Sequence, residues 1–392
     1  MRDVNALLAE RARQLGPEYL TGPETRKGHK LVLNKDGNPL RILVAGAHFC
    51  IRIIKEARAL MKRGYIVDAL AGNLSYGIDN FDRIYYWNSG NPNVGIRQLK
   101  SMLPVLAESY DLYVWHNEPD FPVKMMYDAG MGPIVLDAHD LDSVRQNILT
   151  VDEIDMFRYA DGVVHVSKPV HDWANEIHNY TKPTTILYSF CNDDVVDYDP
   201  EEVDSKRSGI VYEGGANPPE SASGFGESFR YRSLYPICKR VVELGNDLTM
   251  YIGNSDALAS YSDFGASIFP PTNYTEMMKG MVRYKWGLVC FNNADGTQRQ
   301  TNMTLTNKWQ EYMMCGLPVI VFGAAETARI TKELGVGIVL ENLDDLGNVD
   351  SNYGHLYPQL KANVEKARKI LTMEQNVWKL ENLYRSVLEQ RK

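Results

Sequence analysis

Residues 41–72, RILVAGAHFCIRIIKEARALMKRGYIVDALAG, contain the pattern of one complete β-α-β unit. The apolar run RILVAGAHF (41–49) is typical of a short buried strand that ends in small residues, and IRIIKEARALMKRG (51–64) has the apolar spacing of a helix. YIVDALAG (65–72) is a second apolar strand. A strand, a helix and another strand in this order predict a parallel sheet with a right-handed crossover.

The same alternation continues along the chain. Further strand-like segments end in polar residues: YDLYVWHNEPD (110–120), GPIVLDAHDLDSVR (132–145), ADGVVHVSK (160–168) and TTILYSFCNDD (184–194). After residue 208 the pattern restarts with SGIVYEGG (208–215) and runs to VGIVLEN (336–342). Ligands of such sheets bind beyond the carboxyl ends of the strands.

We therefore expect an α/β protein with two Rossmann-like domains. An acidic stretch that contains Pro200 and few large aliphatic side chains separates the two patterns and suits a linker. The predicted parts are a short helix and turn at 1–39, a first domain at 40–195, a linker at 196–208, a second domain at 209–357, and helices at 358–392 that pack back on the first domain.

The composition is that of a globular protein, since 44% of the 392 residues are hydrophobic and 23% are charged. The five cysteines show no CxxC or Cys/His spacing, which favours a reducing compartment without structural zinc. No apolar run reaches the roughly 18 residues of a membrane helix, and the N-terminus lacks the apolar stretch of a signal peptide. We expect a cytoplasmic protein, at most peripheral to a membrane.

A second informative stretch is TLTNKWQEYMMCGLPVIVFG (304–323). Thr306 and Asn307 begin a predicted helix whose free N–H groups and positive dipole end can hold a phosphate. Lys308 adds a charge there, and Glu311 lies one turn deeper, within reach of a ribose. The stretch indicates a diphosphate site, and the alternative is an ordinary N-cap followed by a surface lysine.

The NKxxEYMxxGLPVIV pattern in this stretch resembles the donor-binding segment of GT-B glycosyltransferases, particularly those near family 4. The resemblance extends from about residue 40 onward and includes AGAHF, VWHNEP, DAHDLDSVR, ADGVVHVS, IVYEGG, RYRSLYPICKRV and VGIVLEN. It implies two Rossmann-like domains that face each other across a cleft, with the acceptor on the first and the nucleotide-sugar donor on the second. The activity that it implies is sugar transfer to an acceptor hydroxyl, with retention of the anomeric configuration.

The resemblance also implies roles for the residues of the donor segment. The Glu that matches Glu311 holds the donor ribose, while Thr306, Asn307 and Lys308 match residues that hold the diphosphate. Many family-4 enzymes carry another Glu, which contacts the transferred sugar, at the position of Met303. This departure leaves the identity of the sugar and the stereochemical outcome open.

Further donor contacts are predicted after two other strands, at Gly214, Gly215, Arg230, Arg232, Asn292 and Asn293. The glycines would let the backbone approach the diphosphate, and one of the two arginines could clamp it. The asparagines end a strand just before the phosphate-binding helix, where they could meet sugar hydroxyls or simply form a turn.

The DAHDLDSVR segment supplies the catalytic candidates. Asp140 or His139 could remove the proton of the acceptor hydroxyl, although in resembling enzymes the matching His often contacts the donor sugar and its phosphate. Glu118 is the rival base, because the proline after it favours an extended conformation that could point into a cleft. Asp137 and Asp140 could instead cap the following helix.

Three residues at strand ends are predicted to contact the acceptor: His48, His116 and Asn117. His48 could equally be a structural histidine. His165 lies inside an apolar strand and is expected to be a core histidine.

The sequence shows no DxD-type pair placed to bind a metal ion, so we expect no obligatory metal. The only cofactor expected is the nucleotide-sugar donor, a UDP- or GDP-sugar, whose leaving diphosphate would be stabilised by Lys, Arg and a helix N-terminus. The acceptor stays open among a lipid-linked saccharide, a polysaccharide, a modified nucleic acid and a small molecule. Residues 1–63 carry a net charge of +7, whereas the rest of the chain carries −15. The basic residues 1–63 could therefore face an anionic acceptor, or they could form a solvated charged surface.

Two other classes of protein stay open. One is a nucleotide-sugar epimerase of similar two-domain fold, and the other is a non-catalytic protein that binds a dinucleotide. The turn AGAHFC is not a GxGxxG loop, but Asp68 lies near the distance at which a ribose-binding acid would follow one. A cofactor-dependent phosphorylase would need a lysine for pyridoxal phosphate, for which no motif is present.

Overall fold

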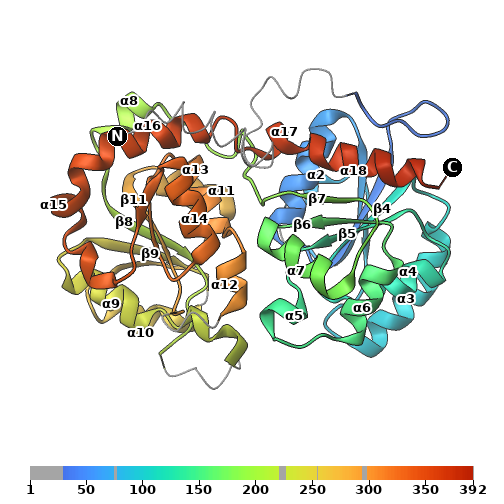
Figure 1. Ribbon diagram of the computed structural model, residues 1–392, viewed down its shortest axis with the longest axis horizontal. Helices are drawn as coiled ribbons and strands as arrows, with labels where there is room; N and C mark the ends of the chain where they lie inside the picture. The colour runs from blue at the N-terminus through green and yellow to red at the C-terminus, as the bar shows by residue number, and fades with distance from the viewer. Residues whose placement is uncertain (1–29, 75–76, 220–226, 254, 294–297, 392) are drawn as a thin grey trace. The chain divides into compact units, whose positions relative to one another are not determined.

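The computed structural model describes residues 30–74, 77–219, 227–253, 255–293 and 298–391. The chain forms two compact units (Figure 1). We call the described residues of 30–192 together with those of 373–391 the N-terminal unit, and the described residues of 193–372 the C-terminal unit. The short helix predicted near the N-terminus lies outside the described residues. Within the described residues, no helix combines the length and the apolar character needed to cross a membrane.

A seven-stranded parallel sheet forms the centre of the N-terminal unit, in the order β3-β2-β1-β4-β5-β6-β7. Its strands are β1 (Arg41–His48), β2 (Ile66–Asn73), β3 (Ile84–Tyr86), β4 (Leu112–His116), β5 (Ile134–Ala138), β6 (Gly162–His165) and β7 (Thr184–Ile186). The strand order reverses between β1 and β4, which is the position where open α/β sheets bind ligands.

The helices of this unit follow the predicted alternation. They are α2 (Ile51–Arg63), α3 (Pro92–Leu106), α4 (Pro122–Asp128), α5 (Asp142–Arg145), α6 (Val151–Tyr159) and α7 (Lys168–His178). The first β-α-β unit forms as expected: α2 ends where Gly64 adopts a left-handed conformation with φ of 102°, and its N–H bonds back to the carbonyl oxygen of Met61.

The C-terminus of the chain returns to the N-terminal unit, as predicted (Figure 1). The returning part comprises α17 (Met373–Asn376), which packs on α2, and α18 (Trp378–Glu389), which packs on β6 and β7. Buried Glu381 of α18 accepts hydrogen bonds from Arg63 (2.9 Å) and Tyr65 (3.1 Å). This part begins at Met373 rather than at residue 358, because α16 (Tyr357–Ala367) packs on α13 of the C-terminal unit.

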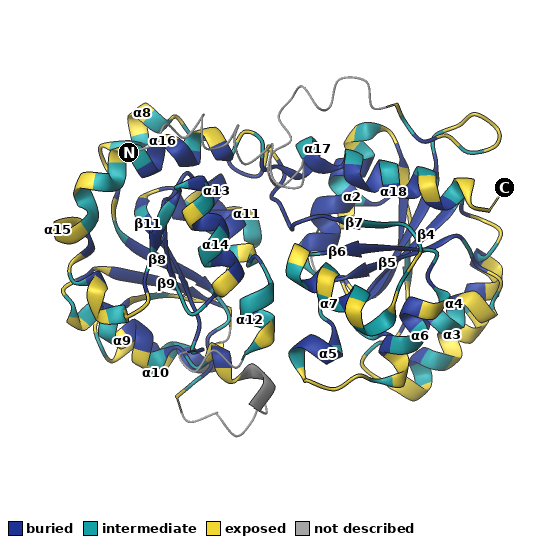
Figure 2. Cartoon of the chain, viewed as in Figure 1, coloured by how far each residue is buried: buried dark blue, intermediate teal, exposed yellow. Residues whose placement is uncertain are grey.

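The C-terminal unit is built on a six-stranded parallel sheet in the order β10-β9-β8-β11-β12-β13. Its strands are β8 (Ser208–Gly214), β9 (Leu248–Ile252), β10 (Ser267–Phe269), β11 (Tyr284–Cys290), β12 (Val319–Phe322) and β13 (Gly337–Val339). Figure 2 shows buried residues along the strands of both sheets. Two parallel sheets with interleaved helices confirm the predicted pair of Rossmann-like domains.

The helices of the C-terminal unit are α8 (Pro200–Asp204), α9 (Tyr235–Glu243), α10 (Leu258–Ser262), α11 (Tyr274–Met281), α12 (Arg299–Met303), α13 (Asn307–Met314), α14 (Ala325–Leu334), α15 (Val349–Tyr353) and α16. The predicted linker at 196–208 is attached to this unit. Arg207 donates hydrogen bonds to the carbonyl oxygens of Cys315 (2.9 Å) and Gly316 (2.6 Å), which caps the end of α13. The composition of this stretch is that of a linker, but Arg207 and Tyr198 hold it against the C-terminal unit. Arg207 bonds to Gly316, and the hydroxyl of Tyr198 donates a hydrogen bond to Glu365.

Candidate functional site

The N-terminus of α13 has the geometry of a capped helix start. Thr306 is the N-cap, and its hydroxyl accepts a 3.4 Å hydrogen bond from the N–H of Trp309. Asn307 and Lys308 occupy the first turn, and Glu311 is buried one turn below. The hydroxyl of Thr306 therefore acts as an ordinary N-cap, as the alternative to a phosphate site predicts. The N–H groups of the first turn remain at the carboxyl edge of the sheet.

Two basic side chains meet at the Gly214–Gly215 turn, which begins at the last residue of β8. A Cβ atom on Gly214 would lie 2.9 Å from Cε and 3.0 Å from Nζ of Lys308. A Cβ atom on Gly215 would lie 3.1 Å from a guanidinium nitrogen of Arg232. Gly214 also has a φ of 118°, which favours glycine. The two glycines therefore leave room for a lysine and an arginine beside the backbone.

Aromatic rings lie beneath the ammonium group of Lys308. Its Nζ atom is 5.1 Å from the ring centre of Phe291 and 5.4 Å from that of Tyr212. Burial lowers the pKa of Lys308, and the carboxylate of Glu213 acts in the opposite direction. The ammonium is thus held partly desolvated, where it interacts more strongly with an anion than a surface lysine does.

The other predicted donor residues lie in different settings. Both arginines are exposed, and it is Arg232 that lies against Gly215. Asn293 is buried, and its side chain bonds to Thr301, Asn302 and the N–H of Gln298, so it forms the turn that was the alternative reading. Asn292 is half-buried and lines a surface cavity of about 540 Å³ with Tyr235, Phe322 and Leu343. The structure therefore gathers Lys308, Arg232 and the two glycines, and gives Asn293 a structural role.

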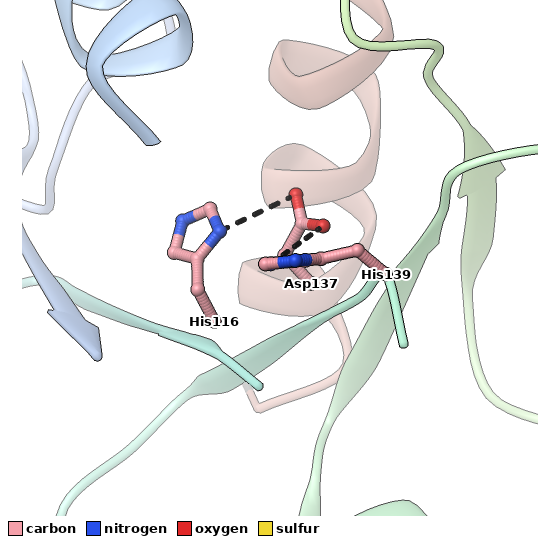
Figure 3. A group of neighbouring side chains, drawn as sticks. All are labelled: His116, Asp137 and His139. Atoms are coloured by element: carbon pink, nitrogen blue, oxygen red, sulfur yellow. Dashed lines mark ion pairs between the residues drawn. The ribbon is translucent and has the colours of Figure 1, made fainter. Parts of the chain in front are cut away.

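Three side chains converge at the ends of β4 and β5 in the N-terminal unit (Figure 3). His116 is the last residue of β4, Asp137 lies in β5, and His139 follows that strand. His116 Nδ1 is 3.8 Å from one oxygen of Asp137, and His139 Nε2 is 3.9 Å from the other. The carboxylate thus lies between the two imidazoles, whose ring centres are 5.5 Å apart.

Sequence reasoning missed two residues of α2 that complete this group. Arg52 donates hydrogen bonds of 3.0 Å to both oxygens of Asp137 and one of 2.9 Å to the carbonyl oxygen of Leu187. Glu56 lies one turn further along α2, with Oε1 3.0 Å from Arg52. Both are buried, and the signal that could have revealed them is the presence of charges within an otherwise apolar helix pattern.

The charges of this group follow from its burial. Burial alone would raise the pKa of Asp137, but the guanidinium of Arg52 outweighs it and holds that pKa well below its usual value. Burial lowers the pKa of His116 to about 3 and also lowers that of His139, so both imidazoles are neutral at neutral pH. Burial raises the pKa of Glu56 well above its usual value.

The three ligand atoms of His116, Asp137 and His139 are close enough together for a metal ion. Both oxygens of Asp137, however, already accept hydrogen bonds from Arg52. A metal ion at this position would also lie beside the positive charge of the guanidinium. The arrangement therefore disfavours a cation and favours a fixed, neutral pair of imidazoles.

Asn117 bonds to the loop after β5, and Glu118 pairs with a residue of α5. The side chain of Asn117 accepts hydrogen bonds from the N–H groups of His139 (2.8 Å) and Asp140 (3.4 Å) and donates one to the carbonyl oxygen of Asp140 (2.5 Å). Glu118 forms an ion pair with Arg145. The side chain of Asn117 thus fixes the backbone that carries His139 and Asp140, and its contact with the acceptor stays a prediction.

Asp120, on the same loop as Glu118, is a further titratable residue that the sequence did not reveal. It is buried, and burial, followed by the nearby carboxylates of Asp142, Glu153 and Glu118, raises its pKa to about 8. The loop that carries Glu118 and Asp120 therefore has a carboxyl group that holds its proton at neutral pH.

Two further histidines lie in different settings. His48 ends β1 and is exposed, whereas His165 is fully buried, as expected of a core histidine.

The structure removes the main support for a dinucleotide site at the first strand. Asp68 is fully buried in β2, where its carboxylate accepts hydrogen bonds from Tyr110 (2.7 Å) and Arg41 (3.2 Å). Because this carboxylate is fully buried, it is not accessible to a ribose.

Comparison with known families matches residues 247–379 to the family described as "Glucosyltransferase 3-like, C-terminal domain". No curated protein sequence matches the chain. Among solved structures, the chain is similar to sucrose-phosphate synthase from Thermosynechococcus elongatus (14% identity, TM-score 0.64, 89% of this chain and 99% of that one). It is also similar to Anabaena HepE in complex with UDP (12%, 0.61, 86% and 98%) and to a glycosyltransferase from Rickettsia africae (15%, 0.60, 89% and 98%).

At these identities the structural matches show the fold, and the assignment to family 4 stays a prediction. The family match covers most of the sheet that carries the predicted donor residues, including α13. Together with the two Rossmann-like sheets, it confirms the class of enzyme that the sequence patterns resemble. The chain is a glycosyltransferase with the GT-B fold, whose residues 247–379 match the C-terminal domain of the glucosyltransferase 3-like family.

Proposed function

We propose that this glycosyltransferase transfers a sugar from a UDP-sugar to an acceptor hydroxyl without a metal ion. The observation that carries the proposal is the meeting of Lys308 and Arg232 at the Gly214–Gly215 turn. Two cations and a helix N-terminus at the carboxyl edge of a parallel sheet suit a ligand with two adjacent phosphates. Uridine is proposed as the base because the similar structure of HepE was solved with UDP.

The same residues provide the chemistry of the leaving group. In the transfer, the bond between the anomeric carbon and the β-phosphate oxygen breaks, and a bond to the acceptor oxygen forms. The negative charge that develops on the phosphate is stabilised by Lys308, Arg232 and the N–H groups of α13. In this proposal they neutralise the leaving diphosphate, as a bound Mg²⁺ can do in other enzymes.

The N-terminal unit would bind sugar hydroxyls and accept the proton. The negative charge of Asp137 favours a proton on the facing Nε2 of His139, which leaves Nδ1 as a hydrogen-bond acceptor. Because burial lowers its pKa, His139 suits a contact to a sugar hydroxyl better than it suits the role of a base. The acceptor proton would then pass to Asp140, to Glu118 or to the departing phosphate.

Isothermal titration calorimetry of the full chain tests the donor site. The ligands are UDP, GDP, ADP, dTDP, CMP and NAD, each in buffer with EDTA. UDP should bind saturably, and Lys308→Ala should weaken it at least about tenfold, the loss expected for one charge-assisted contact. Lys332→Ala, which changes an exposed lysine of α14 in the same unit, is the matched control.

Binding of NAD alone would refute the proposal in favour of a dinucleotide-binding protein. Once an acceptor is found, activity that requires a divalent cation would refute metal independence. The anomeric configuration of the product, measured by proton NMR, decides between inversion and the retention that the family resemblance implies.

A further inference from the structure

Glu213 places a buried carboxylate inside the proposed diphosphate site, where the function above gives it no part. It precedes the Gly214–Gly215 turn at the end of β8 and is 6% exposed. A carboxylate is rarely buried to this extent unless an opposite charge faces it. Lys308 is the nearby candidate for that charge, because its Nζ atom lies 3.0 Å from the position of a Cβ atom on the adjacent Gly214. In agreement, burial lowers the pKa of Lys308, and the carboxylate of Glu213 acts in the opposite direction.

Contacts between α13 and the sheet hold Glu213 and Lys308 together. Lys308 and Tyr312 are four residues apart and share one face of the helix. The hydroxyl of Tyr312 accepts a 2.9 Å hydrogen bond from the backbone N–H of Glu213 and donates a 3.2 Å bond to the carbonyl oxygen of Leu288. On the same face, Lys308 Nζ lies 3.0 Å from the position of a Cβ atom on Gly214, the next residue after Glu213. The backbone of Glu213 is therefore fixed beside the place where the lysine meets the turn.

Resting on the donor site proposed above, we propose that Glu213 is the counter-ion of Lys308 in the empty site and selects the sugar-bearing donor over the free nucleoside diphosphate. A UDP-sugar carries one negative charge on each phosphate. When the bond to the sugar breaks, the oxygen that joined the two stays on the terminal phosphate and becomes ionisable, with a pKa of about 6, so UDP carries about one more negative charge at neutral pH. A fixed carboxylate repels this product more than the donor, and so favours its release.

Calorimetric titration of UDP and UDP-glucose measures the selection. The variants are Glu213→Gln, which removes the charge at nearly constant shape, Glu213→Asp, which keeps it, and Glu243→Gln as an exposed control on α9. In Glu213→Gln, UDP should bind about tenfold more tightly and UDP-glucose only about threefold more tightly, because the removed repulsion scales with ligand charge. Glu213→Asp and Glu243→Gln should leave the ratio of the two dissociation constants unchanged.

Equal changes for both ligands, or weaker binding of both by Glu213→Gln, would overturn the inference and make Glu213 a ligand of the ribose or sugar. Glu213→Ser carries the same expectation as the Gln variant if the latter does not fold. Absence of UDP binding by the wild-type chain, or unchanged binding by Lys308→Ala, would instead overturn the donor site itself. The two failures are therefore distinguishable.

Discussion

Replacing Arg52 with Met should strongly destabilise the N-terminal unit, because Asp137 would keep its charge in a fully buried position without a counter-ion. Arg52 donates two hydrogen bonds of 3.0 Å to Asp137 and one of 2.9 Å to the carbonyl oxygen of Leu187. Removing one partner of a buried ion pair costs about 3–5 kcal/mol. For a unit of this size, we expect the melting temperature to fall by roughly 10 °C.

Differential scanning calorimetry measures the fall, and hydrogen–deuterium exchange of peptides from β4 and β5 assigns it to the N-terminal unit. Arg158→Met is the matched control, because the side chain of Arg158 is 63% exposed and pairs with Asp155 on the surface. Loss of such a pair should change the free energy of unfolding by less than about 1 kcal/mol.

The destabilisation should also depend on pH. In the wild-type protein Arg52 holds the pKa of Asp137 below its unfolded value of about 4, so the ion pair stabilises the fold above that pH and loses its effect as the pH falls further. In Arg52→Met, burial would raise the pKa of Asp137, and protonation at acid pH would relieve the cost. The difference in melting temperature should therefore shrink between about pH 8 and about pH 5. A difference that is constant with pH, or no larger than that of Arg158→Met, would refute the reasoning.

Three further predictions concern single positions. Gly214→Ala should lower the free energy of unfolding by about 1–3 kcal/mol and weaken UDP binding, because a φ of 118° is strained for alanine and the new methyl would lie 2.9 Å from Lys308. Melting and titration experiments measure the two effects. Gly354→Ala is the control, because a Cβ atom added there would meet nothing within 4 Å. Burial and nearby carboxylates raise the pKa of Asp120 to about 8, so its ionisation destabilises the fold as the pH rises from about 4 through about 8. Asp120→Asn should therefore lose less stability than the wild-type protein over this range, and melting curves measured from about pH 4 to about pH 8 check it. Asn117→Ala should cost about 1–3 kcal/mol in urea unfolding, because it leaves the N–H groups of the loop after β5 without their hydrogen-bond acceptor, and unchanged stability would contradict its positioning role.

Local patterns were sufficient to predict both sheets, since each strand and helix displays its own hydrophobic period. The unit at 41–72 formed as expected, and α13 begins at Asn307 directly after its N-cap, because apolar spacing and capping are properties of neighbouring residues. The predicted return of the C-terminus was confirmed, but its starting point at Met373 was not foreseen. Amphipathic helices such as α16 do not show in their sequence which sheet their apolar face will cover.

Which charged residues pair across distant segments of the chain could be determined only from the tertiary structure. Asp137 could be named as a strand-end carboxylate, but its partner Arg52 lies far away in the sequence on α2, and no local period links them. Likewise, only the folded chain separates Arg232 from Arg230 and places Lys308 over Gly214. Secondary structure follows from short-range sterics and hydrophobic spacing, whereas the ionisation and roles of polar side chains depend on burial and on neighbours that tertiary packing brings together.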